Sequence, residues 1–221
     1  MSYSVDRCAT ATQAALGPVG PAGFRHLVGY LSAQQQTRLL EEIQAVIVAA
    51  PLFVPTMPRT GKPFSVRMTN CGSLGWVSDK SGGYRYQATH PATGNAWPAL
   101  PGRVLALWNE VTAYPRLPQA CLVNYYAPGA KMGSHRDGDE EDRSAPVVSI
   151  SLGDHATFHI GGLKRTDPKR RLLLESGDVV VLGGAARMAY HGIDRIHSGT
   201  CGLLEEGGRL NLTLRRVTEP A

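Results

Sequence analysis

Two stretches of the chain repeat apolar residues at the spacing of an amphipathic helix. The first lies between Ser32 and Pro51, and its apolar face is formed by Leu39, Leu40, Ile43, Val46 and Ile47. Ser32, followed by Gln35, resembles a capping box, which favours a helix start at this point. A second helix is predicted over residues 102–113, before Pro115, with an apolar face formed by Val104, Leu107, Trp108 and Val111.

From residue 120 onward, the pattern changes to short apolar or alternating runs that are separated by turns. Seven strands are predicted, over residues 121–126, 147–152, 157–160, 171–174, 179–182, 188–193 and 210–217. Gly161-Gly162 and Ser176-Gly177 are among the turn residues that separate them. Short strands at close spacing, with no helix between them, are typical of an antiparallel sandwich or barrel.

The two remaining regions have less regular patterns. Residues 1–30 are predicted to be irregular. Residues 52–101 are rich in Pro, Gly, Thr and Asn, but they also contain Trp76, Tyr84 and Trp97. A flexible linker would contain few such aromatic residues, so strands and long loops are predicted there instead. We expect a single domain over residues 1–221.

Composition agrees with a globular chain and narrows its cellular setting. The 221 residues are 43% hydrophobic and 19% charged, and a chain of this length buries a core without covalent cross-links. The four cysteines, Cys8, Cys71, Cys121 and Cys201, form no CxxC pair, which favours a reducing cytosol. No secretion signal or membrane-length apolar run is present, so we expect a cytoplasmic protein without membrane contacts. The net charge of +5 weakly favours a polyanionic partner.

His135 and Asp137 are the first candidates for a metal site. In a strand, residues two apart point to the same face, so these two side chains can converge on one ion. Non-haem Fe(II) oxygenases bind their metal with two histidines and one carboxylate on one face and leave the opposite positions open. A second histidine from a distant strand is therefore expected.

The other histidines differ in how well they suit this role. His191 is preferred because it lies in an apolar run that ends at Gly192. His155 and His159 are possible alternatives because they alternate in one predicted strand. The least suitable are His26, His90 and His197, which lie in irregular segments or in a predicted Ser/Gly turn.

The acidic residues that follow Asp137 have a competing explanation. Asp137, Asp139 and Glu141 match the first three ligand positions of an EF-hand calcium loop. However, Asp142 stands where that loop needs glycine, and Val148 stands where it needs glutamate, which excludes the motif. The remaining acids are predicted to form a solvent-exposed turn: Glu140, Glu141 and Asp142.

Polar and apolar residues alternate strictly in the last predicted strand. One face carries Arg209, Asn211, Thr213 and Arg215, and the other face carries only leucines. Arginines that face a barrel interior need an anionic partner, and a guanidinium group binds a carboxylate in a bidentate manner. A bound dicarboxylate is one interpretation. An edge strand with solvated arginines is the other.

Together, five segments resemble the AlkB family of Fe(II)- and 2-oxoglutarate-dependent dioxygenases, and its bacterial alkylation-repair members most closely. They are MTNCGSLGW, NYYAPGAKMGSHRDGDE, GGLKRTDPKRRLLLESGDVVVLGG, YHGI and RLNLTLRR, and the resemblance covers roughly residues 60–217. It implies a mainly β fold with flanking helices and a double-stranded β-helix (jelly-roll) core at 115–217. It also implies an N-terminal extension and helix at 1–50 and a nucleotide-recognition lid at 52–101.

The resemblance also implies an active site that uses Fe(II), 2-oxoglutarate and O2. The implied metal ligands, which are also the catalytic residues, are His135, Asp137 and His191. The residues implied to hold 2-oxoglutarate are Asn124, Tyr125, Tyr126, Arg209, Asn211 and Arg215. The residues implied to contact the substrate base are Trp76, Tyr84, Arg85, Tyr86, Asp139 and Arg165.

The activity implied by the resemblance is oxidative demethylation of 1-methyladenine and 3-methylcytosine. The substrate would be alkylated DNA, preferentially single-stranded, with RNA as a further substrate, and the protein would act as a monomer. Trp76 would stack the base against His135, and the Asp139 carboxylate would favour a cationic base over a neutral one. Formaldehyde, succinate and CO2 would be the products.

The chain departs from the family pattern at a few positions, and two other functions remain open. Leu182 stands where a bacterial repair member carries tryptophan, one extra residue lies between Trp76 and Tyr84, and residues 58–63 add Arg59 and Lys62. These changes bear on the range of substrates. The first alternative is an oxygenase of the same chemistry that acts on protein, tRNA or a small molecule. The second is a cupin-like binding module without enzymatic activity.

Overall fold

Both helices predicted from apolar periodicity are present. In the computed structural model, which describes residues 20–219, α1 spans Ala33–Ala49 and α2 spans Gly102–Val111. The Ser32 hydroxyl accepts a hydrogen bond from the Gln35 backbone nitrogen, and Gln35 Oε1 accepts one from the Ser32 backbone nitrogen at 2.9 Å. The capping box is therefore confirmed.

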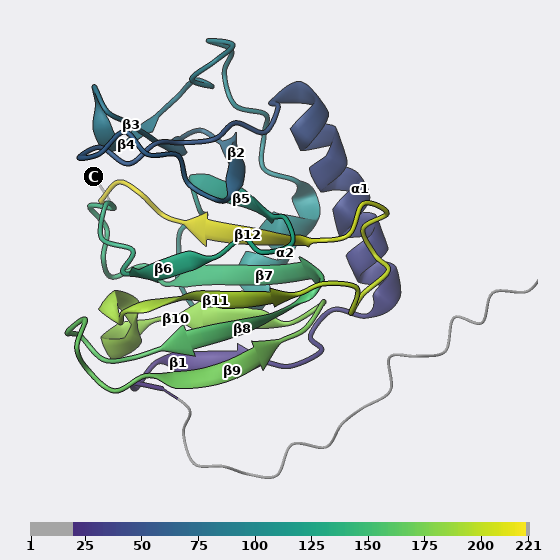
Figure 1. The fold of residues 1–221 in the computed structure, drawn as a ribbon, viewed down its shortest axis with the longest axis vertical. Helices are drawn as coiled ribbons and strands as arrows, with labels where there is room; N and C mark the ends of the chain where they lie inside the picture. The colour runs from purple at the N-terminus through teal and green to yellow at the C-terminus, as the bar shows by residue number, and fades with distance from the viewer. Residues whose placement is uncertain (1–19, 220–221) are drawn as a thin grey trace, which may run out of the picture.

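Twelve strands in the described residues form three antiparallel sheets (Figure 1). The large sheet has the order β1-β10-β7-β12-β5-β2, the second sheet has the order β6-β11-β8-β9, and β3 pairs with β4 in a hairpin. The strands are β1 Phe24–Leu27, β2 Arg67–Gly72, β3 Gly75–Asp79, β4 Gly83–Gln87, β5 Ala120–Tyr126, β6 Met132–His135, β7 Val147–Gly153, β8 His155–Ile160, β9 Arg170–Leu174, β10 Val179–Leu182, β11 His191–His197 and β12 Arg209–Arg215.

Alternate residues of the large sheet contribute to two separate apolar cores. Val123 and Leu212 belong to a core that includes the buried faces of α1 and α2. Leu122 belongs to a second core, to which the other sheet contributes Phe158 and Ile193. Two facing sheets, with helices against the outer face of one of them, form the predicted jelly-roll with flanking helices.

One segment that was predicted to be irregular contains a strand. β1 pairs with β10 at the edge of the large sheet, and His26 Nε2 lies 2.8 Å from Asp178 Oδ2. The strand has only four residues, too few to show a period of two above background. Residues 1–19, which include Cys8, lie outside the described part of the chain.

Both predicted bounds of the strand at residues 188–193 are wrong. Its first residue, Met188, ends a 3₁₀ helix, η1 (Gly184–Met188), and β11 runs from His191 to His197. His197 therefore lies in a strand rather than in a turn. Apolar character did not distinguish the two elements because both the helical turn and the strand bury residues, such as Ala186 and Ile193.

Residues 52–101 contribute to two of the sheets. β2 pairs with β5 at the edge of the large sheet, and the β3–β4 hairpin follows it. The turn of the hairpin is closed by Asp79 Oδ1, which accepts hydrogen bonds from the backbone nitrogens of Ser81 and Gly82 at 2.9 and 2.6 Å. Figure 1 shows the hairpin at the same end of the molecule as the C-terminal end of β12.

The cysteines and the lengths of the helices bear on the predicted cellular compartment. Cys71, Cys121 and Cys201 are free thiols in the described residues. Between residues 20 and 219, neither helix has the length and apolar character that crossing a membrane requires.

Candidate metal centre

A cavity of about 330 Å³ opens between the two main sheets. Its walls come from both sheets, from the β3–β4 hairpin and from the segment that joins β6 to β7, residues 136–146, which we call the metal loop. Polar side chains gather at the side formed by β5, β6, β11 and β12. The chemistry of the site is therefore concentrated where the two sheets approach each other.

His135, Asp137 and His191 are brought together in this cavity. Their ligand atoms all lie within 4.8 Å of one another. His135 ends β6 and His191 begins β11, and the two residues are partners in the pairing of these strands. Asp137 lies on the metal loop, just beyond β6, so the turn of the chain, rather than strand alternation alone, places its carboxylate beside the two rings.

The orientation of both imidazole rings suits metal binding. His135 Nδ1 lies 3.0 Å from the Gly133 carbonyl oxygen, and His191 Nδ1 lies 3.0 Å from the Ala189 carbonyl oxygen. A ring nitrogen that donates to a carbonyl leaves the other nitrogen as a free electron-pair donor. Each Nε2 atom faces the Asp137 carboxylate at 3.8 Å. Two imidazoles and one carboxylate form the donor set expected for non-haem Fe(II).

The electrostatic environment keeps His191 and Asp137 in their metal-binding protonation states. Burial and the neighbouring His135 lower the pKa of His191 to about 4, so its ring is neutral near pH 7. Burial opposes ionisation of Asp137, but the Arg215 guanidinium outweighs it and holds the pKa of this carboxyl well below its usual range. Arg215 Nη2 donates to Asp137 Oδ1 at 2.8 Å.

The other candidate histidines lie elsewhere. His159 is on β8, where its Nδ1 lies 2.8 Å from Asp194 Oδ1, and His155 pairs with His197 toward the opposite end of that strand. His26 lies on β1, and His90 lies next to Phe53 and Trp97. The preference for His191 is therefore the one that agrees with the geometry.

The polar face of β12 lines the cavity, as the alternation predicted. Arg209, Asn211, Thr213 and Arg215 are all in its wall, and Leu210, Leu212 and Leu214 pack into the core on the helix side. β12 lies between β7 and β5 in the interior of the large sheet. The interpretation of this segment as an edge strand with solvated arginines is therefore wrong.

Arg209 is a fully buried cation in the wall of the cavity. Its side chain is 0% exposed, Nη2 donates to Ser151 Oγ at 2.6 Å, and Nε has no hydrogen-bond partner. Burial lowers the pKa of this guanidinium to about 10, so it is still charged near pH 7. No carboxylate pairs with it in residues 20–219, and the nearby Asn124 Oδ1 is also unpaired. A buried cation beside empty space fits an anionic ligand.

The three consecutive residues predicted on β5 do not share one face. Asn124 and Tyr126 line the cavity, and burial raises the pKa of Tyr126 to about 12. The structure does not bring Tyr125 to this site, because successive strand residues point to opposite faces. Its hydroxyl donates to Gly207 O at 3.3 Å, and the Arg67 guanidinium lies 4.7 Å from its ring centroid.

Aromatic and charged residues surround the mouth of the cavity. Trp76 Nε1 donates to Asp139 Oδ2 at 2.8 Å, and the rings of Trp76 and Tyr84 stack with centroids 5.5 Å apart. Tyr84 is 52% exposed. Arg165 also lines the cavity, with its guanidinium 5.1 Å from the centroid of the Tyr190 ring. These three predicted base contacts and Asp139 therefore lie together.

Two predicted base contacts lie away from the cavity. Arg85 forms an ion pair with Asp79 at 2.8 Å within the hairpin. Tyr86 is turned toward the metal loop, where its hydroxyl donates to Glu140 and lies 3.4 Å from Arg215 Nη1. Arg85 points to the face of β4 opposite to Tyr84, whereas Tyr86 shares the face of Tyr84 and its hydroxyl reaches Glu140 instead of the cavity.

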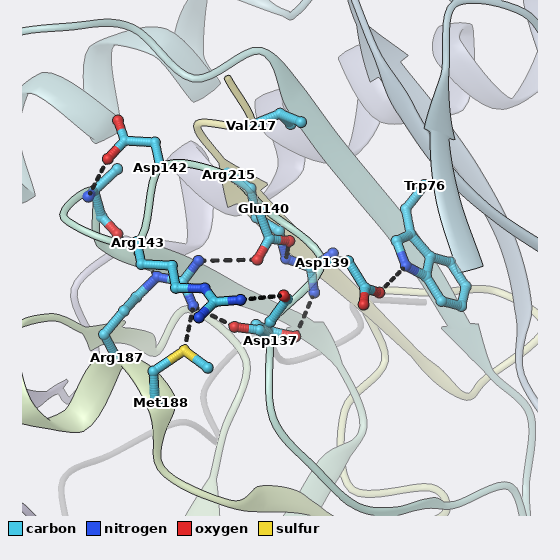
Figure 2. A network of polar contacts seen from close by, with 12 residues as sticks. Trp76, Asp137, Asp139, Glu140, Asp142, Arg143, Arg187, Met188, Arg215 and Val217 are labelled. Atoms are coloured by element: carbon cyan, nitrogen blue, oxygen red, sulfur yellow. Dashed lines mark hydrogen bonds and ion pairs between the residues drawn. The ribbon is translucent and has the colours of Figure 1, made fainter. Parts of the chain in front are cut away.

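The prediction of a solvent-exposed turn at residues 140–142 is wrong for two of the three acids. Glu140 is 3% exposed and pairs with Arg187 at 2.9 Å, and Figure 2 shows this pair beside Asp137. Asp142 is also buried and accepts hydrogen bonds from the following backbone. Glu141 is exposed, as predicted. The sequence has no signal for the Glu140–Arg187 pair, because the two residues lie far apart in the chain.

Known proteins match this chain over most of its length. A model of the 2OG-Fe(II) oxygenase superfamily matches residues 23–215. The "Alpha-ketoglutarate-dependent dioxygenase AlkB homolog" of Caulobacter vibrioides is 50% identical over 195 residues, 88% of each chain. The corresponding AlkB protein of Escherichia coli K12 is 46% identical over 184 residues, 81% of this chain and 84% of that protein.

More distant relatives extend the similarity. The "DNA N(6)-methyladenine demethylase ALKBH1C" of Arabidopsis thaliana is 30% identical over 229 residues, which cover 90% of this chain and 50% of that protein. The solved structure of OsALKBH1 superimposes with a TM-score of 0.74 at 31% identity, covering 92% of this chain and 99% of that one. The similarity therefore extends over the jelly-roll and both sides of the cavity.

Proposed function

This chain belongs to the AlkB family of the 2OG-Fe(II) oxygenase superfamily, and from that premise we propose that it removes methyl groups from alkylated nucleobases by oxidation. Membership makes it an Fe(II)- and 2-oxoglutarate-dependent dioxygenase whose cofactors are Fe(II), 2-oxoglutarate and O2. The residues that line the cavity and its mouth support a methylated base as the substrate.

His135, Asp137 and His191 would hold the iron. Their free Nε2 atoms and ionised carboxylate form the required donor set. Bound Fe(II), with 2-oxoglutarate and O2, supplies the oxidation that hydroxylates an N-methyl group while 2-oxoglutarate becomes succinate and CO2. The hydroxymethyl product releases formaldehyde and leaves the unmodified base.

The observation that carries the cosubstrate assignment is the unpaired charge of Arg209. Arg215 already pairs with Asp137 at 2.8 Å, whereas Arg209 has no carboxylate partner in the described residues. We assign the carboxylate of 2-oxoglutarate farther from the metal to Arg209. Asn124, Tyr126 and Asn211 line the same part of the cavity and would fix the orientation of the ligand. Arg215 would contribute charge near the metal end.

The mouth of the cavity suits a flat cationic base. The faces of Trp76 and Tyr84 offer a stacking surface, and the Asp139 carboxylate lies beside it. 1-Methyladenine and 3-methylcytosine carry a positive charge that unmodified bases lack, so a carboxylate at this point favours them. A base reaches a cavity between two sheets only when it is unpaired or flipped out, which supports a preference for single strands.

The test is formaldehyde release from a single-stranded oligonucleotide that contains one 3-methylcytosine, in the presence of Fe(II) and 2-oxoglutarate. We expect turnover by the parent protein and by the control Glu141→Gln, which changes an exposed acid on the same loop. His135→Ala and Asp137→Ala should abolish both turnover and metal binding, because each removes one of three ligands.

Three results would contradict parts of this proposal. Retained turnover in His135→Ala or Asp137→Ala would refute the metal assignment. Succinate formation without formaldehyde from any methylated oligonucleotide would point to another substrate. Failure to form succinate under all of these conditions would favour a binding module.

A further inference from the structure

Two consecutive acids on the metal loop contact the two strands of the β3–β4 hairpin. Trp76 on β3 donates to Asp139, and Tyr86 on β4 donates to Glu140. Trp76 and Tyr86 are direct partners across the hairpin, so their side chains lie on the same face of it. The cross-strand pair Trp76–Tyr86 is therefore hydrogen-bonded to two adjacent residues of the metal loop.

The two contacts differ in burial. Asp139 is exposed at the mouth of the cavity, where a ligand can compete for its carboxylate. Glu140 is 3% exposed and its partner Arg187 is 2% exposed, so their pair is shielded from water. The contact through Glu140 is thus able to hold the hairpin when Asp139 turns to a ligand.

Glu140 is connected to the metal ligand through two arginines. Arg215 Nε lies 3.4 Å from Glu140 Oε1, and Arg215 Nη2 donates to Asp137 Oδ1 at 2.8 Å. Arg187 Nη2 donates to Glu140 Oε2 at 2.9 Å, while its Nη1 donates to the Asp137 carbonyl oxygen at 2.6 Å. Figure 2 shows Asp137 and Glu140 between these two arginines.

Arg187 also fixes the far end of the metal loop. Its Nε donates to the Ala145 carbonyl oxygen at 2.9 Å. Because Glu140 pairs with Arg187, it fixes the position of the side chain that links Asp137 to Ala145 across the metal loop. Without the Glu140 charge, the buried Arg187 guanidinium would lose its carboxylate partner, which is costly and would loosen its hold on the carbonyl oxygens of Asp137 and Ala145.

We propose that Glu140 is a positioning residue that couples the β3–β4 hairpin to the metal and cosubstrate site. Through Arg187 and Arg215 it holds Asp137 in the geometry that binds the metal. Through Tyr86 it holds the hairpin that covers the cavity. That the site binds a metal follows from family membership, and the role of Glu140 toward the base rests on the proposed function.

The test compares Glu140→Gln and Tyr86→Phe with the matched control Glu141→Gln. The readouts are Mn(II) affinity, the thermal unfolding midpoint, and affinity for a labelled single-stranded 3-methylcytosine oligonucleotide with and without Mn(II) and 2-oxoglutarate. Mn(II) occupies the same type of donor set as Fe(II). None of these measurements requires turnover.

Glu140→Gln should weaken Mn(II) binding about tenfold, as is typical when a group that orients a metal ligand is changed. Tyr86→Phe should keep Mn(II) affinity near that of the parent, because it leaves both charges of Glu140 and Arg215 in place. In the parent protein and in the control, Mn(II) with 2-oxoglutarate should tighten oligonucleotide binding. Both variants should lose that increase, because the connection between hairpin and metal loop is broken.

Two outcomes would overturn the inference. Mn(II) affinity in Glu140→Gln equal to that of Glu141→Gln would refute the positioning of Asp137. An unchanged increase in oligonucleotide affinity in Tyr86→Phe would refute the coupling, and this variant decides the matter even if Glu140→Gln does not fold. A parent protein that binds Mn(II) but no oligonucleotide would refute the proposed base substrate and the coupling together, while the Mn(II) arm would still decide the role of Glu140 at the metal.

Discussion

The polar floor of the cavity, formed by Asn124, Arg209 and Asn211 on β5 and β12, differs from the β3–β4 hairpin in how it is held. β12 pairs with neighbours on both sides over nearly its full length, and Arg209 is fully buried. In the described part of the chain, the two hairpin strands pair only with each other, and Tyr84 is half exposed. Interior strands open least in native proteins, whereas exposed hairpins open more easily.

This contrast separates two requirements of the proposed reaction. Charge placement around the metal needs a rigid, dry frame, which the paired strands supply. Exchange of a large substrate needs a surface that opens, which the hairpin supplies. Changes in the floor should therefore act on cosubstrate affinity, and changes in the hairpin should act on base affinity.

The largest effect is expected for Arg209→Met. Loss of the buried cation should weaken 2-oxoglutarate binding by more than about 100-fold, because breaking a buried ion pair costs about 3–5 kcal/mol. Affinity for the oligonucleotide without cosubstrate should stay near that of the parent. Calorimetric titration of 2-oxoglutarate onto the Mn(II)-loaded protein measures this effect, with Arg38→Met on the exposed face of α1 as the control. A 2-oxoglutarate affinity within a few-fold of the parent would contradict the assignment of Arg209.

A smaller effect, on base affinity rather than cosubstrate affinity, is expected for Trp76→Ala. Stacking of a base on an aromatic ring is worth about 1–3 kcal/mol, so KM for the oligonucleotide should rise about tenfold. The affinity for 2-oxoglutarate should not change. Trp76→Phe keeps a ring face but removes the hydrogen bond to Asp139, so it should lie between Trp76→Ala and the parent. Equal losses of cosubstrate and base affinity would contradict the assignment of Trp76 to base stacking alone.

The smallest effect is expected for Asp139→Ala. Removing its carboxylate should reduce the preference for charged 3-methylcytosine over a neutral methylated base about fivefold, because a charge pair at 4 Å in water is worth about 1 kcal/mol. Asp139 is exposed, so the preference of the parent should also weaken as salt is raised. Competition between the two lesions at low and high ionic strength measures both effects. A variant with the selectivity of the parent would refute this role of Asp139.

The elements that were predicted correctly have a strong pattern of their own. α1 has a capping pair and a repeated apolar face, and β12 alternates over seven residues between a polar cavity face and leucines in the core. Burial on one face imposes such periods directly on a sequence. β1 and β6 have four residues each, and neither carries a pattern that exceeds chance.

Within the candidate site, local spacing was informative where one segment holds the partners. His135 and Asp137 are two residues apart, and their approach follows from the short path between them. The burial of Glu140 did not follow, because its neighbour Glu141 has the same chemistry and is exposed. The difference is made by Arg187 on η1 and Arg215 on β12, which both lie beside Glu140 and pair with it.

The amino-acid order alone was sufficient to establish the helices, the alternation of β12, the candidate metal residues and, through resemblance, the dioxygenase family. Only the folded chain decides which charges meet: Asp137 with Arg215, Glu140 with Arg187, and Arg209 with no carboxylate from residues 20–219. The physical reason is that periodicity reports the solvent exposure of a face, which is a local property. Ion pairs instead depend on where distant strands place their side chains, and that is set by the packing of the two sheets.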